Sequence, residues 1–150
     1  MRPEPIRGVL FDLDDTLLDH SAAAASAIRR LVRDVTGRAD DDAGAVDRWR
    51  ALERQHFARY AAGELGIDEQ RRERIRAFFA LPDASDDRLD ALFADYLRHY
   101  EAGWCPIPGS LEVVFTLVEQ GLPVAVLTNG SPTSNAGSCA GSGATIRASG

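Results

Sequence analysis

Two short apolar segments limit what this chain can fold into. They are GVLFDL at residues 8–13 and VAVLT at residues 124–128. The turn residues Asn129 and Gly130 follow the second segment. Near-continuous apolar runs of this length are typical of strands buried in a parallel sheet. Parallel strands need a long connection, usually helical, and the residues between these segments show mainly helical periodicity. The order therefore predicts an α/β fold with a parallel sheet.

The block between the two segments is long enough to form a domain of its own. It contains about 80 residues, whereas a crossover between parallel strands needs about a dozen. Apolar stripes predict four helices, running from Ser21 to Gly37, from Val46 to Gly63, from Asp68 to Pro82, and onward from Ser85. Their aromatic residues are expected to form a bundle core. We expect an inserted four-helix domain at residues 19–103 and a discontinuous α/β core at residues 1–18 and 104–130.

The part of the chain after the bundle divides into a helix, a strand and a tail. A fifth helix is predicted from Ser110, which can cap it, to Gln120, with Gly121 as its stop. Residues 131–150 are rich in Gly, Ser and Ala and contain almost no large apolar side chain. Such a segment buries too little surface to offset its ordering entropy, so we expect a disordered tail.

Composition narrows the range of partners. The 150 residues carry a formal net charge of −6, which argues against nucleic acid or anionic lipid as the main partner. All 17 basic residues are arginine. No uncharged apolar run of about 18 residues exists, so no membrane span is expected. The N-terminal sequence lacks the apolar stretch of a signal peptide, and a cytoplasmic location is expected. Cys105 and Cys139 are too few for a disulfide framework or a four-thiolate zinc site.

Three acids stand at the end of the first predicted strand: Asp12, Asp14 and Asp15. In open α/β sheets ligands bind at this carboxyl edge, and carboxylates crowded there need a cation or a substrate to offset their repulsion. Positions i and i+2 of a strand face the same way, so Asp12 and Asp14 are expected to face that edge together. The alternative interpretation is that the acids cap a helix or form a turn.

The same residues carry a family resemblance. VLFDLDDTLLD, residues 9–19, resembles the first motif, D-x-D-x-T, of the haloacid dehalogenase (HAD) superfamily. AVLTNG, residues 125–130, is similar to the second motif, a strand ending in Thr or Ser. The long helical insert resembles the cap of that superfamily. The resemblance implies a HAD-like Rossmannoid sheet with an inserted cap, and a magnesium-dependent hydrolase.

The resemblance also implies roles for particular residues. Asp12 would be the nucleophile that forms an aspartyl-phosphate, and Asp14 the general acid and base. Mg²⁺ would be bound by the Asp12 carboxylate and the Asp14 backbone carbonyl. The Thr128 hydroxyl and the Asn129 backbone N–H would hold the phosphoryl oxygens. Because a departing halide needs no proton, Asp14 favours a phosphatase acting on a small phosphomonoester over a 2-haloacid dehalogenase.

The resemblance stops after the second motif. The third motif supplies a Lys or Arg and the fourth one or two Asp, but this chain contains no lysine and no acid after Glu119. We expect a HAD-like chain shortened by truncation or a frameshift, with weak or absent activity. The alternative from a different class is a non-catalytic remnant that binds phosphate or a protein partner.

Other polar residues have simpler expectations. The four arginines between residues 71 and 76 are expected to form a solvated face paired with Glu69 and Glu73, and the alternative is a cap arginine that reaches a distal anion of the substrate. His56 and His99 lack Cys or acidic residues at metal-binding spacing, so zinc is not expected. His20, directly after the first motif, is expected to be a hinge side chain, with substrate contact as the alternative.

Overall fold

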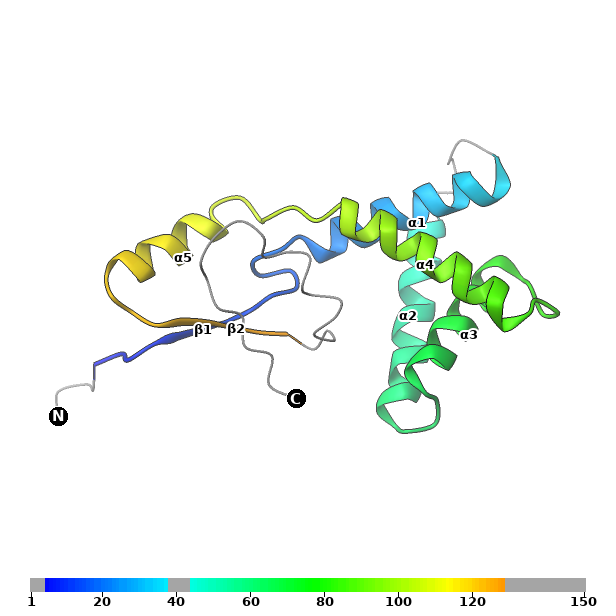
Figure 1. Cartoon of the computed structure of the whole chain (residues 1–150), viewed down its shortest axis with the longest axis horizontal. Helices are drawn as coiled ribbons and strands as arrows, with labels where there is room; N and C mark the ends of the chain where they lie inside the picture. Colours follow the sequence, from blue (N-terminus) through cyan, green and yellow to red (C-terminus); the bar gives the residue numbers. More distant parts are fainter. Residues whose placement is uncertain (1–4, 38–43, 129–150) are drawn as a thin grey trace. The chain divides into compact units, whose positions relative to one another are not determined.

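A computed structural model describes residues 5–37 and 44–128 (Figure 1). The chain divides into a sheet unit, formed by residues up to Ser21 and from Trp104, and a helical unit, Ala22–Gly103. The elements in chain order are β1 (Val9–Asp12), α1 (His20–Thr36), α2 (Ala45–Ala61), α3 (Ile67–Phe79), α4 (Asp86–Ala102), α5 (Ser110–Glu119) and β2 (Val124–Leu127). Helix α1 therefore begins in the sheet unit and continues in the helical unit.

The predicted α/β class with a parallel sheet is confirmed. β1 and β2 lie side by side in parallel, with Val9 opposite Val124 and Asp12 opposite Leu127 (Figure 1). Along both strands half-buried residues alternate with exposed ones, so the expectation of buried strands is wrong for the described residues. Helix α5 is the described helix that packs against β2, and cover from one helix leaves half of the strand residues exposed.

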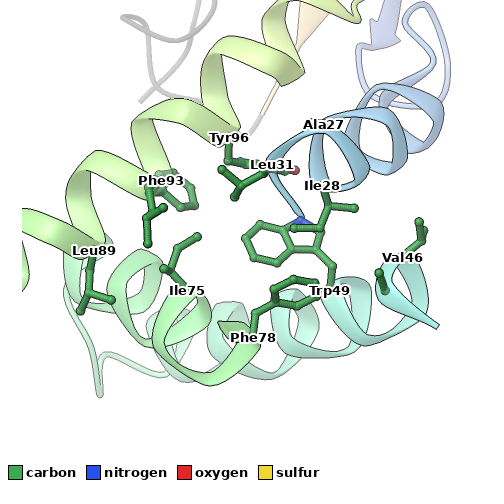
Figure 2. Packing of buried hydrophobic residues seen from close by; sticks show 12 residues of the cluster. Ala27, Ile28, Leu31, Val46, Trp49, Ile75, Phe78, Leu89, Phe93 and Tyr96 are labelled. Atoms are coloured by element: carbon green, nitrogen blue, oxygen red, sulfur yellow. The ribbon is translucent and has the colours of Figure 1, made fainter. Parts of the chain in front are cut away.

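The helical unit is held together by a core of apolar side chains from all four of its helices. Trp49 lies at the centre of this cluster in Figure 2, with its ring 5.3 Å from that of Phe78 in an edge-on arrangement and 4.7 Å from that of Tyr96. Burial raises the pKa of Tyr96 to about 12. The expectation of an aromatic bundle core is confirmed, except that Phe57 and Tyr60 are exposed and lie outside the core. The other large buried members are Ile28, Leu31, Val46, Ile75, Leu89, Leu92 and Phe93.

Several predicted helix ends are confirmed and others are shifted. Ser85 caps α4 by accepting a hydrogen bond from the backbone N–H of Arg88, and Gly37 follows α1 with a left-handed φ of 66°. Asp68 does not cap α3, because Gly66 occupies that position. Ser110 is likewise inside its helix, since Gly109 is the N-cap residue of α5.

The arginine cluster departs from its expected solvated state at one position. Arg74 is 5% exposed, and its guanidinium lies 4.4 Å from the Trp49 ring centroid and 5.1 Å from that of Phe93. Its Nη1 donates to Oε1 of Glu53 at 2.5 Å. Cation–π contacts compensate for desolvation of the guanidinium, which is why this charge can lie inside the bundle. The prediction of a solvated side chain is therefore wrong for Arg74.

The other three arginines also pair with acids. Arg76 contacts Glu73, as expected. Arg71 instead contacts Asp68, and Arg72 contacts two acids of α4, so the expected partners Glu69 and Glu73 are wrong for these two side chains. The guanidinium of Arg72 lies 2.8 Å from a carboxylate oxygen of Asp86 and 2.7 Å from one of Asp90.

No described helix combines the length and the apolar character needed to cross a bilayer.

Candidate active site

The register of the two strands places the first candidate residues. Asp12 is the last residue of β1 and is the parallel partner of Leu127, the last residue of β2. The backbone N–H of Leu13 donates to the carbonyl of Leu127 at 3.2 Å, which extends the pairing one step past Asp12. Thr128 follows Leu127 directly, so Asp12 and Thr128 stand at the same carboxyl edge of the sheet. Asn129 lies outside the described residues.

Asp14 is placed by a tight loop rather than by strand alternation. β1 ends at Asp12, and the backbone N–H groups of Leu17 and Leu18 both donate to the carbonyl of Leu13 at 3.0 Å. Asp14 forms an isolated bridge with Leu18 across this loop. The argument from positions i and i+2 of a strand therefore does not apply, although Asp12 and Asp14 are both exposed.

The loop is anchored to the segment that follows the helical unit. The N–H of Asp19 donates to the carbonyl of Cys105 at 2.9 Å, and the N–H of Ile107 donates to the carbonyl of Leu17 at 2.9 Å. The Ser110 hydroxyl donates to the same Leu17 carbonyl at 3.0 Å. Sequence patterns gave no indication of these contacts, because they join residues more than 80 positions apart. They fix the backbone that carries Asp14.

Asp15 has a different role from the two acids before it. Its backbone is left-handed, with φ 55°, and its carboxylate accepts hydrogen bonds from the N–H and the hydroxyl of Ser21, both at 2.8 Å. Ser21 was predicted to cap α1, but it lies in the first turn and is itself bound by Asp15. The capping interpretation therefore applies to Asp15.

The acids at this edge supply oxygen donors suited to a hard cation. Mg²⁺ is usually held by one or two carboxylates and keeps several waters, so the Asp12 carboxylate and the Asp14 carbonyl fit as two of its ligands. The Asp12 Oδ1 accepts a hydrogen bond from the N–H of Leu13 at 2.9 Å, which orients the carboxylate. Within residues 5–37 and 44–128, no group of three or more His, Cys, Asp and Glu is arranged around a possible metal position.

His20 lies close to one of these acids. It is the first residue of α1, and its Nδ1 lies 4.0 Å from Oδ1 of Asp14, with the two side chains 30% and 47% exposed. This distance is too long for a hydrogen bond but short enough for an electrostatic contact when His20 is protonated. His56 and His99 lie in the helical unit, on α2 and α4.

The chain thus has a parallel α/β sheet with an aspartate at the end of its first strand. A sequence model of the haloacid dehalogenase-like hydrolases matches residues 6–146, and the chain belongs to that family. No match was found among curated protein sequences.

Solved structures of this family resemble the chain. YfnB of Bacillus subtilis, described as a HAD-hydrolase bound to magnesium, has a TM-score of 0.72 and 25% identity, over 89% of this chain and 58% of its own. The defluorinating L-2-haloacid dehalogenase Rha0230 has a TM-score of 0.66 and 19% identity, over 95% and 60%. A predicted phosphoglycolate phosphatase from Haemophilus somnus has a TM-score of 0.54 and 19% identity, over 85% and 53%. The chain thus spans 60% or less of each of these relatives.

Proposed function

We propose that this chain carries the nucleophile and the general acid of a magnesium-dependent phosphatase that acts on a small phosphomonoester. The observation that carries the proposal is the parallel pairing of Asp12 with Leu127. The proposal is supported because, in this register, Asp12 at the end of β1 and Thr128 after β2 stand at one sheet edge, and Asp14 lies in the loop after Asp12. Membership of the HAD-like hydrolases supports the same assignment.

The first chemical step would be attack on phosphorus by the Asp12 carboxylate. The P–O bond to the leaving group breaks, and Asp14 donates its proton to the departing oxygen. The Thr128 hydroxyl would donate a hydrogen bond to a phosphoryl oxygen. Mg²⁺ held by Asp12 and the Asp14 carbonyl would supply positive charge that offsets the repulsion between carboxylate and phosphate. The products of this step are an alcohol and a phosphorylated Asp12.

The second step would hydrolyse that intermediate. Asp14, now ionised, takes a proton from a water molecule as the water oxygen attacks phosphorus. The bond between phosphorus and the Asp12 oxygen breaks, which releases inorganic phosphate and restores both acids to their starting forms. The helical unit would serve as a cap that restricts the substrate to small molecules.

Asp14 favours phosphate-ester hydrolysis over dehalogenation. An alkoxide leaving group needs a proton, whereas a halide leaves without one, so an acid at this position benefits only the first reaction. Solved relatives include both a dehalogenase and a predicted phosphatase, so the fold alone does not choose between them. Release of chloride from 2-chloropropionate, with no release of phosphate from esters, would favour the dehalogenase.

A second candidate is a module that binds phosphate without turnover. It is favoured by the charge distribution, since the chain contains no lysine and its last acid, Glu119, precedes β2. Positive charge and further metal ligands normally contribute several kcal/mol to phosphoryl transfer. Such a module would bind Mg²⁺ and a phosphate mimic such as beryllofluoride but release no product.

The test is phosphate release from p-nitrophenyl phosphate with and without Mg²⁺, for the purified chain and for Asp12→Asn. We expect magnesium-stimulated hydrolysis that is abolished by this substitution. Asp87→Asn, an exposed acid in the first turn of α4, is the matched control and keeps full activity. Activity that survives Asp12→Asn eliminates the nucleophile, and binding of magnesium and beryllofluoride without turnover identifies the second candidate.

A further inference from the structure

Asp15 holds a backbone conformation that needs an explanation. Its φ of 55° lies in the left-handed region, which an L-residue other than glycine adopts at a cost. Asp and Asn tolerate this region better than other residues, and the conformation persists where surrounding contacts hold it. The contacts here are the two hydrogen bonds from Ser21, one from its backbone N–H and one from its hydroxyl, both 2.8 Å. We call Asp15 and Ser21, with these two bonds, the loop clamp.

The loop clamp acts on the same loop that carries Asp14. The backbone N–H of Asp15 donates to the carbonyl of Leu18 at 2.8 Å. The backbone N–H of Leu18 in turn donates to the carbonyl of Leu13 at 3.0 Å. Asp14 is therefore flanked by a residue fixed through both its backbone and its side chain. A change in the backbone at Asp15 would rotate the peptide next to Asp14 and redirect its carboxylate.

The clamp also fixes the first turn of α1 beside Asp14. Ser21 is the residue after His20, whose Nδ1 lies 4.0 Å from Oδ1 of Asp14. Two adjacent residues of this turn thus contact two adjacent acids of the loop: Ser21 binds Asp15, and His20 lies near Asp14. If Asp15 served only to cap α1, the contact between His20 and Asp14 would not be required.

We propose that Asp15 is a positioning residue, which acts through Ser21 to orient Asp14 for proton transfer. The inference rests on the proposed function, since it assigns Asp15 a role in that reaction. It differs from a purely structural cap in one respect. Loss of a cap lowers stability alone, whereas loss of orientation at Asp14 slows the steps that need its proton.

The test separates the two chemical steps with acetyl phosphate. Its leaving group is a carboxylate that needs no proton, so phosphorylation of Asp12 proceeds without help from Asp14, whereas hydrolysis of the aspartyl-phosphate still requires Asp14 as a base. Asp15→Gly keeps the left-handed backbone accessible and removes the carboxylate. We expect quench-flow measurements with Mg²⁺ to show wild-type phosphorylation and roughly tenfold slower dephosphorylation, so that phosphorylated Asp12 accumulates.

Three further variants calibrate the result. Asp14→Asn gives the full loss of the base, expected at about 10²-fold or more on dephosphorylation. Ser21→Ala removes one of the two hydrogen bonds and is expected to fall between wild type and Asp15→Gly. Ser85→Ala removes the corresponding cap of α4 and is expected to lower the melting temperature without any change in either step.

The outcomes are distinguishable. Wild-type dephosphorylation in Asp15→Gly, or equal slowing of both steps, overturns the positioning role and leaves the proposed function intact. A wild-type chain that acetyl phosphate never phosphorylates at Asp12 overturns the proposed function and this inference with it. Accumulation of phosphorylated Asp12 in Asp15→Gly and not in Ser85→Ala supports both.

Discussion

Asp12 and Leu127 are direct partners in the parallel pairing of β1 and β2. The consequence is that Thr128, the next residue, is the first position beyond β2 at the edge where Asp12 ends β1. Neither strand alone determines this relationship, because a shift of one residue would turn every side chain of a strand to the opposite face. The register is therefore the structural basis for the proposed role of Thr128 alongside Asp12.

The first prediction concerns the Thr128 hydroxyl. Thr128→Ala is expected to lower kcat/KM for p-nitrophenyl phosphate by about 10²-fold, because one preorganised donor to the phosphoryl oxygens is lost. Thr128→Ser keeps the hydroxyl and is expected to stay within a few-fold of wild type. Steady-state kinetics at saturating Mg²⁺ measure both. Equal activities for the Ala and Ser variants would remove Thr128 from the site.

The second prediction concerns the buried cation of the helical unit. Arg74→Met removes the hydrogen bond to Glu53 and the stacking on Trp49, and is expected to lower the free energy of unfolding by roughly 2 kcal/mol. Urea unfolding followed by circular dichroism measures the change. Arg98→Met is the matched control, because that side chain is 70% exposed beside Asp95 and its pairing contributes at most about 1 kcal/mol. Equal losses for the two variants would contradict a stabilising role of the buried contacts.

Arg74 also marks what the sequence could not predict. Helical periodicity assigns arginine to the polar face, and this assignment holds for Arg72, which pairs with exposed acids. Arg74 differs because three aromatic rings and Glu53 converge on it from α2 and α4, and its place depends on how the helices pack. The strand segments and the apolar stripes were predictable, because their periodicity is local.

The candidate site was predictable to a similar degree. The acids at the end of β1 and the threonine after β2 were predictable from the motifs and from the rule that parallel strands end at one edge. The contact between Asp15 and Ser21 was not foreseen, because a serine before an apolar stripe normally predicts the cap itself. The structure instead starts α1 at His20, and Ser21 donates to an acid six residues earlier.

The third prediction concerns the turn after α2. Gly63 has φ 75°, and a Cβ built there meets no atom within 4 Å, so the cost of a side chain is conformational rather than steric. Gly63→Ala is expected to lower the free energy of unfolding by roughly 1 kcal/mol. Gly63→Asn is expected to cost clearly less, because Asn tolerates the left-handed region. Thermal unfolding of both variants measures the difference, and an Ala variant as stable as the Asn variant would refute the argument.

The last prediction concerns His56, whose side chain is 4% exposed. Neither of its ring nitrogens has a hydrogen-bond partner among the described residues. Burial lowers the pKa of His56, and the nearby charge of Arg59 lowers it further, whereas Glu73 opposes the shift and Arg74 adds to it. The fold therefore disfavours the protonated imidazole.

The direction of the pH effect follows from that depressed pKa. Above pH 6.5 His56 is mainly neutral in both states, so its contribution to stability does not change with pH. Below pH 6.5 the unfolded chain takes up a proton that the folded chain resists, so stability falls as the pH falls towards the folded-state pKa. Urea midpoints measured between pH 8 and pH 5 are expected to decline more steeply in wild type than in His56→Phe. Because an aromatic side chain without unsatisfied nitrogens fits a buried position at little cost, the variant should match wild type near pH 8. Parallel declines in the two proteins would show that other groups cause the loss of stability in acid.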